Sequence, residues 1–164
     1  MTLATPGNAS EADVKTATAK AMRYCAYQER APKEVLEKLL NLGLGLSHDQ
    51  AMAVVHHLVQ EDFINEARFA ALYTGGKFRL KKWGKDKIRV ALQQKGIGPQ
   101  QVEQALAQLN AAQYEACLTE LYQHKRQQLG TLPPLQLKQK LFNYLRGKGY
   151  ETHLIHQLLQ DNGL

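Results

Sequence analysis

The chain has 164 residues, a length typical of about one domain, and 44% of them are hydrophobic. No apolar run approaches the roughly 20 residues that a membrane-spanning helix needs, and the first 20 residues contain no hydrophobic signal-peptide core. We therefore expect no membrane contact and a cytoplasmic location. Cys25 and Cys117 are too few for a disulfide framework and are expected to be free thiols.

A short pattern occurs three times: an apolar residue, a second one four positions later, and a glycine four positions after that. The copies are Val35-Leu39-Gly43, Ile88-Leu92-Gly96 and Leu141-Leu145-Gly149, and 53 residues separate equivalent positions. Residues four apart share one face of a helix, and glycine favours the left-handed conformation that ends one. The pattern predicts an all-α chain of three tandem three-helix repeats, an organisation typical of proteins that bind surfaces.

In chain order, we predict a disordered tail over residues 1–14 and a first three-helix repeat over residues 15–64. Its first helix is expected over residues 17–29, and Pro32 begins a second helix that stops at Gly43. Ser47 and Gln50 have the spacing of a capping box, which predicts the start of the third helix.

The second repeat is predicted over residues 65–110 and begins with Asn65 as the N-cap. Gly75 and Gly76 are expected to interrupt or bend its first helix. Gly84 separates that helix from the next, over residues 85–95, and Pro99 begins the third. The third repeat is predicted over residues 111–164, with a break at Pro133-Pro134.

Positive charge is concentrated in the second repeat. Between residues 68 and 95 only Asp86 opposes nine basic residues, so this stretch carries +8 although the whole chain carries +6. Such a local excess indicates contact with nucleic acid or with an acidic protein surface. We interpret the charges as a contact surface rather than a solvated helix face, and the interleaved Phe78 and Trp83 as core residues rather than stacking platforms. The nine predicted contact residues are Arg68, Lys77, Arg79, Lys81, Lys82, Lys85, Lys87, Arg89 and Lys95.

Residues able to carry chemistry do not form a recognisable set. The histidine groupings, His56-His57 and His153 with His156, have no third or fourth ligand at metal-site spacing. No phosphate-binding loop, zinc-protease motif or nucleophile elbow is present. We therefore predict no catalytic residues, no cofactor and no metal.

The central residues are similar to a known motif. Asn65-Glu66-Ala67-Arg68-Phe69-Ala70 through Tyr73, then Trp83-Gly84 and Lys87-Ile88, then Leu92 through Gly96-Ile97 resemble the RecX family, regulators of the RecA recombinase. Asn65-Glu66 departs from the two aspartates usual at that point. The positions that carry the resemblance as a structural motif are Phe69, Tyr73, Trp83, Gly84, Ile88, Leu92 and Gly96.

The resemblance implies a fold of tandem three-helix repeats in an elongated, curved array. It also implies a protein of DNA repair and the SOS response. Such a protein lies in the groove of the RecA–DNA filament and limits homologous recombination, ATPase and coprotease activity. From the residues we expect a non-enzymatic protein, and we expect a monomer, although the sequence leaves the oligomeric state open. Whether the basic residues face DNA or RecA stays open.

The expected partners are the RecA filament and DNA, single-stranded or duplex, bound without sequence preference. A second interpretation is a tandem helical protein that acts on duplex or single-stranded DNA directly. Tandem DNA-binding repeats of this size tend to carry several tryptophans, whereas Trp83 is the only one here. The third helix of the second repeat, over residues 102–110, also has no lysine or arginine, which disfavours it as a recognition helix. The RecA-directed interpretation is therefore preferred.

Overall fold

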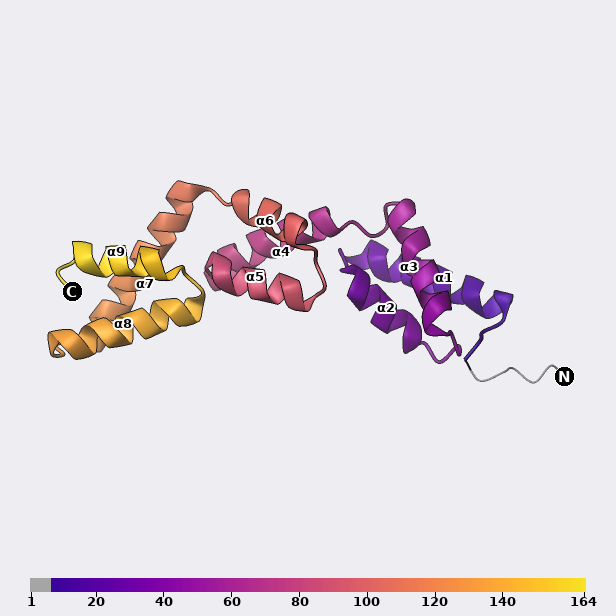
Figure 1. Ribbon diagram of the computed structural model, residues 1–164, viewed down its shortest axis with the longest axis horizontal. Coiled ribbons are helices and arrows are strands. Elements are labelled where there is room, and N and C mark those ends of the chain that lie inside the picture. The colour runs from indigo at the N-terminus through magenta and orange to yellow at the C-terminus, as the bar shows by residue number, and fades with distance from the viewer. Residues whose placement is uncertain (1–6) are drawn as a thin grey trace. The chain divides into compact units, whose positions relative to one another are not determined.

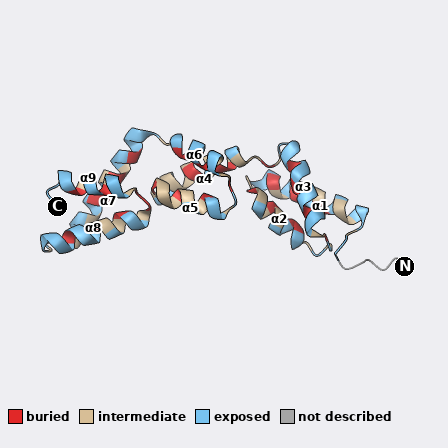
Figure 2. Cartoon of the chain, viewed as in Figure 1, coloured by how far each residue is buried: buried red, intermediate tan, exposed pale blue. Residues whose placement is uncertain are grey.

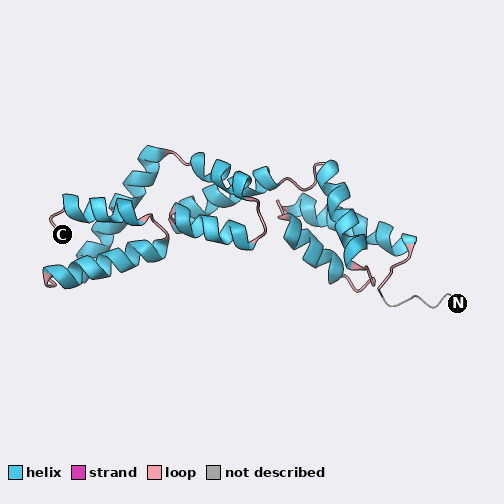
Figure 3. Cartoon of the chain, viewed as in Figure 1, coloured by secondary structure: helices cyan, strands magenta, loops and turns pink. Residues whose placement is uncertain are grey.

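The computed structural model describes residues 7–164, which form nine helices and no strand (Figures 1 and 3). The predicted all-α class is confirmed. The helices are α1 (Glu11–Tyr27), α2 (Pro32–Leu40), α3 (His48–Gln60), α4 (Glu66–Lys81), α5 (Lys85–Gln94), α6 (Pro99–Ala107), α7 (Ala111–Leu129), α8 (Pro134–Lys148) and α9 (Thr152–Asp161).

The described chain divides into two compact units. Unit 1 contains the residues up to Ala70 together with Gln94–Gln101, and unit 2 contains Ala71–Gln93 and Val102–Leu164. Helices α4 and α6 therefore contribute to both units. A compact unit need not coincide with a sequence repeat, so the repeat boundaries at residues 64 and 110 stay predictions.

The threefold sequence pattern forms the core that it predicts. Its six apolar residues, in α2, α5 and α8, are at most 1% exposed. Its three glycines have left-handed φ angles of 74°, 78° and 97°, and Gly149 is the C-cap of α8. In Figure 2 the buried residues follow the inward faces of each helix group. The buried seam is therefore confirmed in all three copies, but the predicted stop of the first copy at Gly43 is wrong, because α2 ends at Leu40 and Asn41 is its C-cap.

The helix starts also agree with the local chemistry of the sequence. Ser47 and Gln50 form the predicted capping box, with the Gln50 backbone N–H donating to Ser47 Oγ at 3.1 Å and the Ser47 N–H donating to Gln50 Oε1 at 3.0 Å. Asn65 Oδ1 accepts from the Arg68 N–H at 2.9 Å, at the start of α4. Helix α6 begins at Pro99, as predicted.

Two further expectations are wrong. The tail does not extend to residue 14, because α1 begins at Glu11, where Ser10 Oγ accepts from the Asp13 N–H at 3.1 Å. Residues 1–6 of that predicted tail lie outside the described residues. Gly75 and Gly76 do not interrupt α4, which is continuous from Glu66 to Lys81. Packing outweighs the low helix propensity of glycine here, since Thr74 beside them is buried and Phe78 packs against the core of unit 2.

Within unit 2, the turn between α4 and α5 contacts the turn between α8 and α9. The Gly84 N–H donates to the Lys148 carbonyl at 2.8 Å, and the Asp86 N–H donates to the Gly149 carbonyl at 2.9 Å. A Cβ on Gly84 would overlap backbone atoms of Gly149 and Tyr150, and one on Gly149 would overlap Lys87. The two turns therefore pack backbone against backbone, and both positions require glycine.

We predict that Gly84→Ala lowers the free energy of unfolding by about 2 kcal/mol or more, because the added methyl group meets backbone rather than a movable side chain. Urea denaturation followed by circular dichroism measures the change. Gly147→Ala is the control: its Cβ would meet no atom within 4 Å, and the helix should gain about 0.5–1 kcal/mol. Equal stabilities for the two variants would contradict the packing described for Gly84.

Candidate binding surface

Six of the predicted contact residues lie where α4 ends and α5 begins. We call this surface the basic corner and define it as Lys77, Arg79, Lys81, Lys82, Lys85 and Lys87, all within unit 2. Lys82 has a left-handed φ of 55°, which turns the chain out of α4, and the close contact of Gly84 with the α8–α9 turn then fixes the start of α5.

Trp83 lies among these cations. Its ring centroid is 4.9 Å from Lys77 Nζ and 4.7 Å from Lys87 Nζ, and the side chain is half-buried. Each ammonium group near the indole face gains about 0.5–1 kcal/mol at such a site. Phe78 instead packs against the core, with its ring centroid 5.9 Å from that of Tyr114. The core interpretation therefore holds for Phe78, whereas Trp83 serves as a platform for two lysines.

Buried tyrosines hold the corner in place. The Lys85 backbone N–H donates to Tyr114 Oη at 2.9 Å, and this hydroxyl donates to Glu151 Oε1 at 2.7 Å. The Tyr150 hydroxyl donates to the Lys82 carbonyl at 3.1 Å. Burial, followed by the hydrogen bond with Glu151, raises the pKa of Tyr114, and burial also raises the pKa of Tyr150. Both hydroxyls therefore stay protonated and continue to donate at neutral pH.

Acidic residues, all but Asp86 from outside the stretch 68–95, pair with four of the nine predicted contact residues. Arg68 pairs with Glu29 and with Asp62, and Lys95 pairs with Glu34 at 2.7 Å. Both of these cations belong to unit 1, whereas the corner belongs to unit 2. In unit 2, Arg89 pairs with Asp86 and Glu103, and Lys82 pairs with Glu120. The count of +8 along the sequence therefore overstates the charge that is left for a partner.

The other five cations have no ion-pair partner among residues 7–164. Lys77 and Lys87 flank Trp83, Lys85 Nζ lies 4.9 Å from the Tyr114 ring centroid, and Arg79 and Lys81 are exposed. These side chains can therefore neutralise an anionic partner without first losing an intramolecular pair.

Sequence reasoning missed cations that the third repeat brings to the same unit. Arg146 donates to Asp86 Oδ2 at 2.7 Å, and Lys125 and Lys148 lie 5.0 Å and 5.9 Å from the Tyr144 ring centroid. Lys148 is the repeat equivalent of Lys95, 53 residues later, and that register was the available signal. The others are remote in sequence from the basic stretch, so counting charge along the chain could not find them.

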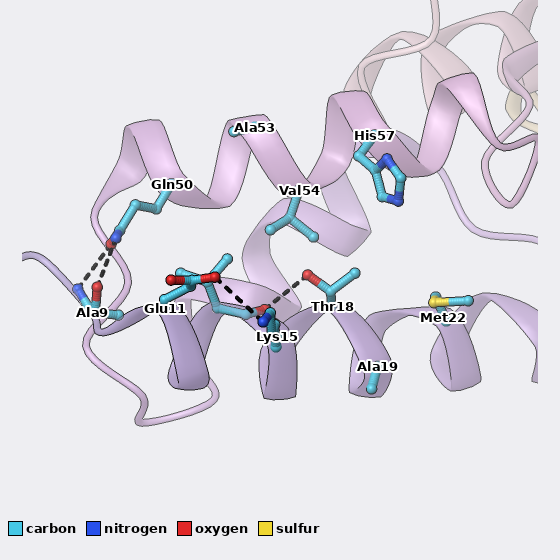
Figure 4. Close-up of a pocket in the computed structure, with 11 residues that line it drawn as sticks. Ala9, Glu11, Lys15, Thr18, Ala19, Met22, Gln50, Ala53, Val54 and His57 are labelled. Carbon is cyan, nitrogen blue, oxygen red and sulfur yellow. Dashed lines mark hydrogen bonds and ion pairs between the residues drawn. The ribbon is translucent and has the colours of Figure 1, made fainter.

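Unit 1 has a separate, mostly apolar groove of about 760 Å³ between α1 and α3 (Figure 4). Val54 and Met22 line it, and Gln50 closes one end through hydrogen bonds with the backbone N–H and carbonyl of Ala9, both at 2.9 Å. Over residues 7–164, no three histidine, cysteine or acidic side chains come together as metal ligands would. No helix in that range is long and apolar enough to span a membrane.

Comparison with known proteins identifies relatives of this chain. The RecX models for the second and third three-helix domains match residues 65–106 and 113–159. Regulatory protein RecX of Lactobacillus gasseri is 29% identical over 140 residues, covering 85% of this chain and 51% of that protein. Regulatory protein RecX of Clostridium acetobutylicum is 31% identical over 112 residues, covering 66% of this chain and 51% of that protein.

The chain thus spans about half the length of these curated relatives. Among solved structures, RecX from Lactobacillus salivarius has a TM-score of 0.82 at 23% identity, covering 93% of this chain and 97% of that chain. A second crystal structure, of a regulatory protein RecX, has a TM-score of 0.81 at 21% identity. At these identities the structural likeness shows the fold.

We predict that Arg68→Gln lowers the free energy of unfolding by about 1–2 kcal/mol, because it leaves a largely buried Glu29 carboxylate without its partner. Arg79→Gln, which removes an exposed cation, should change it by less than about 0.5 kcal/mol. Urea denaturation at pH 7 checks both values. Stabilities that differ by less than the fitting error would contradict a structural role for Arg68.

The same variant has a pH signature. The hydrogen bond with Asn65, and next the charge of Arg68, lower the pKa of Asp62. Such a carboxylate stabilises the fold above its unfolded pKa, about 3.9, and that contribution is lost as pH falls through the lower folded value. The stability difference between wild type and Arg68→Gln should therefore shrink below about pH 4. A difference that stays constant from pH 7 to pH 3 would contradict this ion-pair origin.

Proposed function

Because this chain belongs to the RecX family of regulatory proteins, we propose that it binds the RecA filament assembled on DNA and mainly inhibits RecA. The inhibited activities are the recombinase, ATPase and coprotease functions that serve DNA repair. In this proposal the protein is a monomeric, non-enzymatic regulator, and the basic corner contacts DNA in the filament.

The position of the corner within the family match carries the proposal. The domain models cover residues 65–106 and 113–159, which include the corner, Trp83 and the contact between Gly84 and Gly149. Lysine and arginine neutralise phosphates regardless of base sequence, and five cations in this region are free of ion pairs within residues 7–164. The regulatory family and the charged surface therefore support one function.

Direct binding to DNA, independent of RecA, is the alternative that the same surface favours. Helix α6, the third of the second repeat, has no lysine or arginine with which to read a major groove. Binding would then depend on phosphate contacts alone. The two functions differ in stoichiometry, because a filament regulator can act on many RecA subunits at once.

We predict that the protein inhibits RecA-driven ATP hydrolysis on single-stranded DNA at well below one molecule per RecA. Lys81→Glu should weaken this inhibition about tenfold, because it removes an exposed cation and adds a charge that repels phosphate. Lys20→Glu, on the exposed side of α1, is the matched control and should inhibit like wild type. No inhibition by wild type, with DNA binding retained, would favour the alternative function.

We further predict a strong salt dependence of binding to duplex DNA. If all six corner residues contact phosphate, the logarithm of affinity should fall against the logarithm of salt concentration with a slope of about −5. Fluorescence anisotropy with labelled DNA at several salt concentrations measures this slope, and Lys81→Gln should reduce it by about 1. A nearly flat slope would mean that the corner contacts protein instead.

A further inference from the structure

Helix α4 has an apolar face that nothing in the described chain covers. Leu72 and Leu80 are 62% and 79% exposed, whereas Thr74 on the opposite side of the helix is 1% exposed. Gly76 lies midway between the two leucines, and residues four apart align along one side of a helix. We call Leu72, Gly76 and Leu80 the α4 stripe; all three belong to unit 2.

The stripe is hollowed at its centre. The three residues, together with Tyr73, Lys77 and Lys81, line a depression of about 300 Å³. A Cβ on Gly76 would meet no other atom within 4 Å, so the fold does not require glycine there. Alanine would also favour the helix more than glycine does. Gly76 therefore leaves a space that can receive a side chain from outside the protein.

The charge around the stripe is of one sign. No aspartate or glutamate occurs between Glu66 and Asp86, and Lys77 and Lys81 form the rim of the depression. Two copies of this chain meeting through the stripe would bring their lysines together, which disfavours self-association. Phosphates alone would leave the leucines in water, whereas an acidic protein segment with apolar residues can satisfy both.

We propose that the α4 stripe binds an acidic amphipathic helix of a protein partner. An apolar side chain of that helix fills the space over Gly76, and carboxylates beside it pair with Lys77 and Lys81. The mode is that of a helix laid along an apolar groove, with anchors about one turn apart. This inference rests on the proposed function: it gives the stripe, with Lys77 and Lys81, the contact with RecA protein and leaves the contact with DNA to the other corner residues, Arg79, Lys82, Lys85 and Lys87.

The first test separates protein contact from DNA contact. Leu72→Ser combined with Leu80→Ser should raise the concentration for half-inhibition of RecA ATPase about tenfold or more, because two apolar anchors are lost. Affinity for labelled DNA should stay within about twofold of wild type, since neither leucine carries charge. Leu135→Ser, at a leucine 78% exposed on α8, is the control and should change neither value. Equal loss of inhibition and of DNA affinity would overturn the proposal.

The paired glycines give a test that is independent of folding stability. Gly75→Ala and Gly76→Ala both remove a helical glycine with open space around it, so both should raise the thermal midpoint. Only Gly76 lines the depression, so only Gly76→Ala should weaken inhibition, by several-fold. The same inhibition by both variants would overturn the assignment of the space over Gly76.

A synthetic peptide separates failure of this inference from failure of the proposed function. If wild type does not inhibit RecA, the proposed function fails, and the stripe is tested with an amphipathic peptide of leucine and glutamate. Chemical shift changes confined to residues 72–81, absent with a lysine version of the peptide, would support the inference. Equal chemical shift changes with both peptides would overturn the inference. It would also be overturned if the wild-type protein formed a dimer that Leu80→Ser dissociates.

Discussion

The backbone contact between Gly84 and Gly149 determines where the basic corner lies. The N–H groups of Gly84 and Asp86 donate to the carbonyls of Lys148 and Gly149. A side chain at Gly84 or Gly149 would prevent this close approach of the two turns. The hydroxyls of Tyr114 and Tyr150 are also hydrogen-bonded to the backbone of Lys85 and Lys82. The backbone of Lys82 and Lys85 is thus held in place, and apart from Lys82, which pairs with Glu120, the corner lysines have no ion pair within residues 7–164.

A looser form of the same contact occurs one repeat earlier. In unit 1, Gly96 is the repeat equivalent of Gly149, and a Cβ there would lie 3.5 Å from the Cβ of Lys33. Lys33 Nζ also donates to the Gln94 carbonyl at 3.1 Å. In both units, a glycine that ends the second helix of one repeat packs beside the start of the second helix of the repeat before it. The 53-residue period therefore describes a recurring contact between repeats as well as a recurring helix.

This periodicity explains which features could be predicted from the sequence. The buried seam, the Ser47–Gln50 capping box and the Pro99 helix start depend on residues within a few positions of one another. Several of the ion pairs do not: Glu34 is 61 residues from Lys95, and Glu120 is 38 from Lys82. The stretch 68–95 contains Lys82 and Lys95 but neither of these glutamates. Counting charge along that stretch therefore predicted its net charge in the sequence, and not the net charge on the surface of the folded protein. The continuity of α4 through Gly75 and Gly76 likewise depends on tertiary packing that local propensity does not contain.

The partners of each cation divide the basic residues into two roles. Arg68 and Lys95 join segments of unit 1 through Glu29 and Glu34, so their charge is used within the fold. Arg79 and Lys81 have no such partner in residues 7–164 and lie on α4 beside an exposed apolar face. A surface that binds only phosphates does not need exposed leucines, and a surface that binds only apolar side chains does not need these cations. Their combination on one helix supports the proposal that this protein recognises a filament made of both DNA and protein.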